Sequence, residues 1–297
     1  MPFSTAHDLH IHTRLSACCA DETMTPQAIL DYAVAHRYDC ICITDHCWDA
    51  ATPGASDWYR PQTIEHIRRS LPLPECPATP VRAEVASAAA FQKTRTAPAD
   101  HAPCSPAKPA TPVRFLFGCE TEYCGEDRIG ISRTAAEALD FLIVPLNHFH
   151  MEGFVRPASV QTPRAVAALF TERLEQLLRL DLPWSKVGLA HLTCPLLYTA
   201  GDVREVLTLL DPDRFLRLFE QVAARGAGIE LNAGCFPNWN EAPALSLQLY
   251  RWAKRAGCRF YCGSDAHSRA ALDSVGAILP EVARALELTG QDRFVPR

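Results

Sequence analysis

The chain has 297 residues, which is enough for one large α/β domain or two small ones. Hydrophobic residues make up 48% of it and charged residues 21%, as is ordinary for a soluble globular protein. The net charge of −5 argues against broad, non-specific binding to nucleic acid or to an anionic membrane, and no apolar run approaches the length of a membrane span.

The N-terminus and the cysteines both favour a reducing compartment. Residues 1–5 contain no basic region followed by an apolar one, so we expect no signal peptide and a cytoplasmic location. The 13 cysteines include no Cys-x-x-Cys pair, which argues against a zinc ribbon or a thioredoxin-like pair. We therefore expect reduced thiols that pack as small hydrophobic side chains.

The first predicted strand has the sequence HDLHIHT and lies close to the N-terminus. Because alternate residues of an extended strand face the same way, Asp8, His10 and His12 are expected on one face, with Leu9 and Ile11 on the other. Two imidazoles and a carboxylate on one face suit a divalent metal. Taken alone, the motif is equally consistent with two half-exposed histidines on an edge strand.

A helix and a second strand follow. Thr25 and Pro26 are typical of a helix start. The second strand, residues 40–44, is apolar throughout, which favours a parallel sheet that is buried on both sides. The polar residues Asp45 and His46 come directly after it, and active sites of parallel α/β folds are built at that end of the strands.

The segment from about residue 71 to residue 112 has a different composition. It is rich in alanine and proline, and its prolines break any long element. We interpret it as a flexible surface insertion within a single domain that spans residues 1–297. A lid over the substrate is the alternative interpretation.

The rest of the chain predicts five more strands and four helices. The strands are at residues 113–118, 141–144, 187–190, 228–231 and 259–263, and the helices are at 134–139, 162–180, 211–225 and 244–256. Most of these strands are followed by residues that bind metals, namely Glu120, His148, His150, His191, Asp265 and His267. A seven-stranded (β/α) barrel would bring these strand ends to one mouth, so we predict an α/β, TIM-like barrel.

The motifs and their order along the chain resemble those of the PHP family, the polymerase and histidinol phosphatase superfamily of metal-dependent phosphoesterases. The matching pieces are DLHIHT at 8–13, TDH at 44–46, GCE at 118–120, the histidine after the fourth strand, His191, and GSDAH at 263–267. They cover nearly the whole chain apart from the insertion. The resemblance implies a distorted seven-stranded barrel, two or three divalent ions (zinc, manganese or iron) and hydrolysis of phosphate esters.

The resemblance also implies three sets of metal ligands that share one bridging carboxylate. The sets are His10, His12, Glu120 and Asp265 for one ion, Glu120, His148 and His191 for a second, and His46 and His267 for a third.

Two positions in these sets stay open. The family usually adds a His or Asp to the third site, five or six residues after the His-x-His pair, where this chain has Ala17 and Cys18. Asp21 is expected to supply the oxygen instead, and a Cys18 thiolate, which would favour zinc, is its competitor. His150 competes with His148 at the second site, and His148 is favoured because it is nearer the strand end.

The implied activity is hydrolysis of a small phosphorylated metabolite or nucleotide by metal-activated water. Glu120 is expected to bridge two ions, and His46 or His267 to protonate the leaving alkoxide. Arg14 and Arg269 are weak candidates for binding the phosphate, since each lies next to a metal motif.

Two other functions stay open. Amidohydrolase-type C–N hydrolases also use His-x-His on a barrel strand, but they often need a bridging carboxylated lysine, and no lysine follows these strands. The second is a non-catalytic metal-binding relative, against which the nearly complete ligand set argues.

Overall fold

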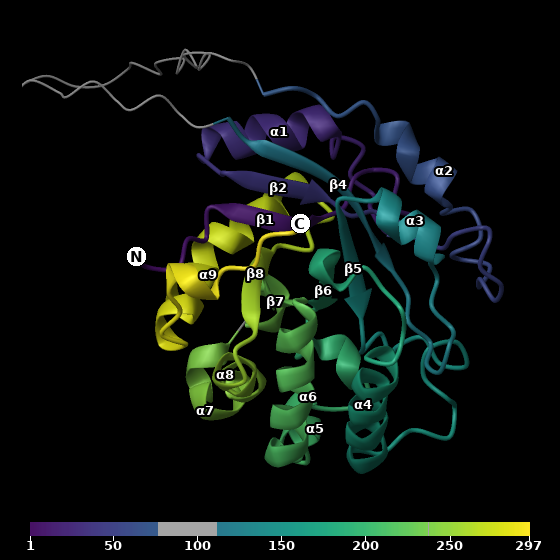
Figure 1. Ribbon diagram of the computed structural model, residues 1–297, viewed down its shortest axis with the longest axis vertical. Coiled ribbons are helices and arrows are strands. Elements are labelled where there is room, and N and C mark those ends of the chain that lie inside the picture. Colours follow the sequence, from purple (N-terminus) through teal and green to yellow (C-terminus); the bar gives the residue numbers. More distant parts are fainter. Residues whose placement is uncertain (77–111, 237) are drawn as a thin grey trace, which may run out of the picture.

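The computed structural model describes residues 1–76, 112–236 and 238–297 (Figure 1). The predicted insertion lies almost entirely outside these residues. The described strands are β1 (His7–Ile11), β2 (Cys40–Ile43), β3 (His46–Cys47), β4 (Arg114–Thr121), β5 (Phe141–Pro145), β6 (Val187–Ala190), β7 (Gly228–Asn232) and β8 (Arg259–Gly263). The described α-helices are α1 (Pro26–Ala35), α2 (Ile64–Ile67), α3 (Arg133–Ala138), α4 (Pro163–Leu177), α5 (Val203–Leu207), α6 (Pro212–Arg225), α7 (Pro243–Ser246), α8 (Gln248–Arg255) and α9 (Ser274–Ala285).

The strands form a parallel sheet that nearly closes on itself. The order around the wall is β1-β2-β4-β5-β6-β7-β8, and the short β3 pairs with β4 beside this path. The two ends of the wall meet where the amide of His12 donates to the carbonyl of Ala266 at 3.0 Å and the amide of Asp265 to that of His10 at 2.8 Å. The helices lie outside the strands (Figure 1). The predicted α/β barrel with seven strands in its wall is therefore confirmed.

The helices begin and end where local chemistry favours it. Thr162 precedes α4 and accepts a hydrogen bond from the amide of Ala165, while Asp211 precedes α6 and accepts one from the amide of Asp213. Gly226 ends α6 in the left-handed conformation, with φ of 79°. Proline occupies the first turn of both helices, as the sequence indicates.

Several elements differ from the prediction. The predicted helix at 244–256 is two helices, α7 and α8, which are separated at Leu247. Helix α9 was not predicted, and it contains Pro280, which ordinarily argues against a helix interior. The short α5 and the two-residue β3 were also not predicted. β4 continues to Thr121, so Glu120 lies inside the strand and not after it.

Side chains that point into the barrel form a small core of their own. They are Leu9, Cys40, Cys42, Leu116, Phe141, Ile143, Ala190, Tyr261 and Phe294. Their neighbours along the strands, such as Ile41, belong to the larger core between strands and helices. Gly188 makes room for two of the interior rings, because a Cβ there would lie 2.5 Å from atoms of both Phe141 and Tyr261. Apolar packing thus fills the barrel beneath the polar strand ends.

The first strand does not alternate as predicted. Leu9 belongs to the interior core but Ile11 to the outer one, because an irregularity in the pairing with β2 lies between Asp8 and Ile11. The expectation that Leu9 and Ile11 share a face is therefore wrong. Asp8 does not join the histidines either, since its Oδ1 accepts hydrogen bonds from the amides of His10 and Ser264. Burial raises the pKa of Asp8 to about 7.

Two expectations about the chain's environment can be compared with the structure. Among the helices that the structure describes, none combines the length and the apolar character needed to cross a membrane. Ten of the described cysteines are buried and form no disulfide, so they pack as small hydrophobic groups, as expected.

His7 gives this fold a measurable dependence on pH. The side chain is fully buried, and its Nε2 accepts a hydrogen bond from the amide of Cys262 at 3.0 Å. Burial, aided by the charge of Arg293, lowers the pKa of His7 from 6.5 to about 3. As the pH falls, His7 of the unfolded chain binds a proton near pH 6.5, whereas His7 of the folded chain binds one only near pH 3. The folded state therefore keeps its full stability above pH 6.5 and loses stability as the pH falls from 6.5 toward 3. The loss between pH 7 and pH 4 should reach about 3 kcal/mol.

Urea unfolding of the wild type and of His7→Gln, both in chelator so that metal binding does not contribute, measures this effect. Glutamine keeps a hydrogen-bond acceptor but does not titrate, so the variant should lose less stability on acidification. His36→Gln, at the exposed end of α1, is the matched control and should follow the wild type. Parallel curves for the wild type and His7→Gln would contradict the assignment.

Candidate metal centre

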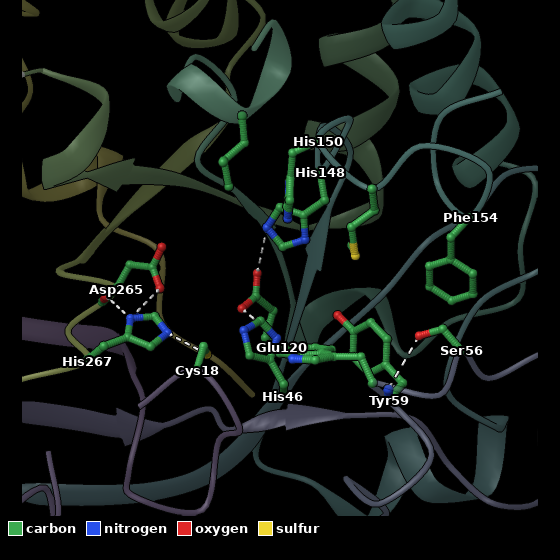
Figure 2. Close-up of a pocket in the computed structure, with 13 residues that line it drawn as sticks. Cys18, His46, Ser56, Tyr59, Glu120, His148, His150, Phe154, Asp265 and His267 are labelled. Atoms are coloured by element: carbon green, nitrogen blue, oxygen red, sulfur yellow. Dashed lines mark hydrogen bonds and ion pairs between the residues drawn. The ribbon is translucent and has the colours of Figure 1, made fainter. Parts of the chain in front are cut away.

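Glu120 on β4 lies at the centre of the polar strand ends, and its side chain is 1% exposed. Five histidine rings surround its carboxylate. Oε2 lies 3.3 Å from each of His10 Nε2, His12 Nε2 and His46 Nδ1, and Oε1 lies 3.1 Å from His191 Nε2 and 3.7 Å from His148 Nε2. Figure 2 shows Glu120 between His46 and His148 in the cavity. Each carboxylate oxygen thus faces its own set of imidazoles, which is the arrangement of a carboxylate that bridges two ions.

The first group of ligand atoms has the dimensions of a metal site. It comprises His10 Nε2, His12 Nε2, Glu120 Oε2 and Asp265 Oδ1. Five distances between pairs of these atoms lie between 3.1 and 3.4 Å. Ligand atoms at about 2.1 Å from a tetrahedral ion are about 3.4 Å from one another. These five distances therefore match the spacing of ligand atoms around one tetrahedral divalent ion.

Two further groups adjoin the first. Glu120, His148 and His191 offer ligand atoms within 4.8 Å of one another, and so do His12, His46 and His267. In the third group the ring of His12 stacks on that of His267, with centroids 4.2 Å apart. The structure thus brings together eight of the nine predicted ligands, and His12 contributes to two groups.

The second ring nitrogen of four of these histidines is held by a neighbouring side chain. Nδ1 of His10 lies 2.7 Å from Glu230, that of His12 2.9 Å from Ser16, that of His148 2.7 Å from Glu122, and that of His191 3.0 Å from the Oδ1 of Asn147. When Nδ1–H donates to these oxygens, the lone pair of Nε2 faces the cluster. The surrounding residues therefore set both the tautomer and the direction of each ring.

Sequence reasoning missed these orienting residues, and Glu230 is the clearest case. It is fully buried in β7, an otherwise apolar strand, and an ionisable residue in such a strand is the signal that was available. Gly263 on the adjacent β8 leaves space for it, since a Cβ there would lie 1.9 Å from Glu230 Oε1 and 2.8 Å from His10 Cβ. Which histidine Glu230 holds depends on the closure of the barrel, which local patterns do not specify.

Two of the candidate ligands adopt backbone conformations that side chains other than glycine rarely adopt. His191 has φ of 27° and Asp265 has φ of 55°. The strand end at His191 is held in place, since its amide donates to Glu230 Oε2 at 2.6 Å and its carbonyl accepts from Asn147 Nδ2 at 2.7 Å. Backbone strain of this kind concentrates at functional sites, where the surrounding structure holds it.

The electrostatics of the group favour anionic carboxylates. Burial raises the pKa of Glu120, but the charges of His46 and His10 lower it by more. The resulting pKa of Glu120 lies well below its usual value. Burial lowers the pKa of His12, whereas its hydrogen bonds to Asp265 and Glu120 raise it to about 9. In the absence of an ion, protons on the imidazoles thus balance the carboxylates. A divalent cation would supply the same positive charge without them.

Two observations test whether the residues fit a metal. The Nδ1 of His46 is buried and has no hydrogen-bond partner among the described residues. The Nε2 atoms of His10 and His12 lie only 3.1 Å apart, while Nδ1 of each ring lies within hydrogen-bond distance of another side chain, Glu230 or Ser16. A shared cation would satisfy both Nε2 atoms once their protons are released. Nitrogen and carboxylate oxygen donors suit zinc, manganese or iron.

Three predicted residues are not brought to the cluster. The carboxylate of Asp21 accepts hydrogen bonds from the amides of Thr23 and Arg269 and lies outside all three groups. These local bonds hold Asp21 in its own loop, and its role as a ligand stays a prediction. The exposed Arg14 lies 3.7 Å from Glu22 and lines a separate cavity, and Arg269 is exposed outside the metal-lined one.

The two alternatives left open by the sequence both lie in the cavity. Cys18 places its Sγ 3.0 Å from Nε2 of His267, at the position that Asp21 was expected to fill. His150 is exposed and lines the cavity beside His148, but it belongs to none of the groups of possible ligands found in the described residues. Burial lowers the pKa of His150 to about 4, so its ring is neutral at pH 7.

Replacement of Glu230 by glutamine tests the role of the orienting residues. Glutamine keeps the shape but removes the charge that holds Nδ1–H of His10, so affinity for the first ion should fall by about 10- to 100-fold. Competition with a chromogenic chelator measures this affinity. Glu220→Gln, on the exposed side of α6, is the matched control and should bind metal as the wild type does. Unchanged affinity in Glu230→Gln would show that Glu230 has no role in metal binding.

The cavity above the cluster has a volume of about 470 Å³. Glu120, Asp265, His46, His148 and His267 lie at its base and sides, as Figure 2 shows. The volume is in the range of small-molecule sites. The cluster is therefore accessible to a small ligand.

Comparison with known proteins shows a shared fold. No protein-family model matches the sequence, and no curated protein sequence matches it significantly. The structure of histidinol phosphate phosphatase from Lactococcus lactis, complexed with zinc, L-histidinol and phosphate, is similar with a TM-score of 0.50, 14% identity and coverage of 94% of this chain and 93% of that chain. A putative histidinol phosphatase from Listeria monocytogenes is similar with a TM-score of 0.53, 15% identity and coverage of 90% and 97%. At these identities the likeness establishes the fold, which is the fold that the sequence motifs imply.

Proposed function

We propose that the protein is a PHP-type, metal-dependent phosphoesterase that hydrolyses a small phosphorylated metabolite or nucleotide. The observation that carries the proposal is the position of Glu120, whose two oxygens face two separate groups of imidazoles at the mouth of the barrel. The fold shared with histidinol phosphate phosphatases, one of them a complex with zinc and phosphate, supports it.

We propose two or three divalent ions. The first is held by His10, His12, Glu120 and Asp265, the second by Glu120, His148 and His191, and the third by His46 and His267 with His12 or Cys18 beside them. Bound divalent ions lower the pKa of water toward neutrality and offset the charge on the phosphoryl group.

The chain's own groups orient the reaction. Hydrolysis forms a bond from a water oxygen to phosphorus and breaks the bond from phosphorus to the alcohol oxygen, which leaves with a proton. Asp265 is 30% exposed, the most accessible carboxylate of the cluster, so it is the acceptor for a hydrogen bond from the attacking water. His267 is 32% exposed; with Nδ1–H donating to the carbonyl of Asp265, its Nε2 faces the cavity beside Cys18 Sγ. Where the third ion is not bound, His267 in its doubly protonated form would give the Nε2 proton to the leaving oxygen and become neutral.

Hydrolysis of para-nitrophenyl phosphate, of the bis-ester and of para-nitroacetanilide tests the proposal. Each substrate is assayed after chelation and again after zinc, manganese or iron is added back. We expect metal-dependent release of para-nitrophenol from a phosphate ester and none of para-nitroaniline from the amide. Turnover of the amide alone would favour a C–N hydrolase, and no turnover of either phosphate ester with any metal would refute a phosphoesterase.

A further inference from the structure

The outer wall of the cavity is apolar and aromatic. Away from the candidate ligands it is lined by Trp58, Tyr59, Met151, Phe154 and Leu196, with Ser56 and His150 as its polar side chains. Among the described residues that line it, none is a lysine or an arginine, and the carboxylates are Glu120 and Asp265, both in the first metal group. Any charge that a substrate carries beyond its phosphate would therefore meet no counter-charge on this wall.

The aromatic rings form a continuous surface that starts at a candidate ligand. The ring of Trp58 lies edge-on to that of His46, with centroids 5.1 Å apart, and edge-on to that of Tyr59, at 4.7 Å. Tyr59 in turn lies 6.0 Å from Phe154. Figure 2 shows Tyr59 and Phe154 on the side of Glu120 opposite to Asp265 and His267. A phosphate held at the ions would extend its ester group along these rings.

Of the polar groups on this wall, the hydroxyl of Tyr59 is turned away from the cavity. The hydroxyl of Tyr59 donates to Glu122 Oε2 at 3.1 Å, and Glu122 also holds Nδ1 of His148. Tyr59 is fully buried, so it presents only its apolar ring to the wall. Trp58 is 40% exposed, a large apolar surface that a bound ligand would cover.

From these contacts we infer that the substrate is a phosphate ester of an uncharged, apolar or aromatic alcohol. This inference rests on the proposed phosphoesterase function. An amino-alcohol phosphate would place its ammonium on a wall without a carboxylate of its own, where a cation–π contact with a ring replaces only part of its hydration. A polyphosphate would bring further negative charge to a wall without cations.

A matched pair of substrates isolates the effect of the ammonium group. 3-Phenylpropyl phosphate and L-phenylalaninol phosphate have the same ring and chain and differ only in the amine. For the metal-loaded full-length protein, we expect kcat/KM to be at least about tenfold higher for 3-phenylpropyl phosphate. Methyl phosphate, which cannot reach the rings, should be a poorer substrate than 3-phenylpropyl phosphate by a similar factor.

Trp58→Ala tests the wall itself. It should reduce the ratio of kcat/KM for 3-phenylpropyl phosphate to that for methyl phosphate by about tenfold, mainly through KM. Leu209→Ala is the matched control, because Leu209 is 42% exposed and does not line the cavity. It should leave the ratio as in the wild type. The metal content of each variant shows whether the centre is intact.

Equilibrium binding separates this inference from the proposed function. Calorimetric titration of the zinc-loaded protein with 4-phenylbutylphosphonate, the non-hydrolysable isostere, and with its amino derivative measures the same preference without turnover. Tighter binding of the phosphonate that lacks the amine, weakened by Trp58→Ala, supports the inference even if no ester is hydrolysed. Equal or tighter binding of the amino derivative would overturn the inference even if phosphate esters are hydrolysed. So would a Trp58→Ala variant whose ratio of kcat/KM for 3-phenylpropyl phosphate to that for methyl phosphate equals the ratio of the wild type.

Discussion

Replacement of Glu120 by glutamine should lower kcat for phosphate-ester hydrolysis by about a thousandfold or more. An amide offers one oxygen to a metal and carries no charge, whereas the Glu120 carboxylate faces His10, His12 and His46 with one oxygen and His148 and His191 with the other. Loss of the bridge removes several kcal/mol of stabilisation of the transition-state charge, and each 1.36 kcal/mol is tenfold in rate. Steady-state kinetics and elemental analysis of the same preparation measure both consequences.

The matched control for this variant is Glu65→Gln, which makes the same chemical change at an exposed position of α2. It should keep the activity and metal content of the wild type. Because the charge of Glu120 also balances the buried histidines, circular dichroism must show that Glu120→Gln is folded before the rates are compared. A folded Glu120→Gln protein with the activity of the wild type would contradict the bridging role.

Chelation should abolish phosphate-ester hydrolysis and also destabilise the fold. Ions that bind only the folded state stabilise it by about 4 kcal/mol when their concentration is a thousand times their Kd. For a chain of this size, removal of such an ion should lower Tm by roughly 5–10 °C. Differential scanning calorimetry and the para-nitrophenyl phosphate assay, on the same samples before and after chelation, measure the two effects.

Addition of zinc or manganese to the chelated protein should restore both the activity and Tm. Magnesium, which prefers oxygen ligands, is the comparison ion and should restore less, since most of the candidate ligands are imidazoles. If the chelated protein retains full activity and the same Tm, then neither catalysis nor stability depends on the cluster.

The sequence predicts the barrel and most of the cluster because both follow from local rules. Apolar strands predict a parallel sheet, and His191, Asp265 and His148 follow within one to three residues of such strands. The carboxyl ends of parallel strands lie at the same edge of the sheet, however the sheet closes into a barrel. The proximity of these side chains could therefore be predicted without coordinates.

The positions that the sequence leaves open or misses depend on the paths of loops and on contacts between distant strands. Asp21 and Cys18 lie in one loop, and only its turn, closed by hydrogen bonds from Thr23 to Asp21, decides which of them approaches His267. Glu230 holds a histidine that is 220 positions away in the chain. Contacts of this kind have no periodicity in the sequence, so they cannot be read from it.

Crystals of the zinc-loaded protein, measured above and below the zinc absorption edge, test the central claim most directly. The account predicts one anomalous peak among His10, His12 and Asp265 and a second between His148 and His191, with one oxygen of Glu120 next to each. Peaks confined to other parts of the surface, or a cluster that binds no zinc while the protein still hydrolyses phosphate esters, would contradict it.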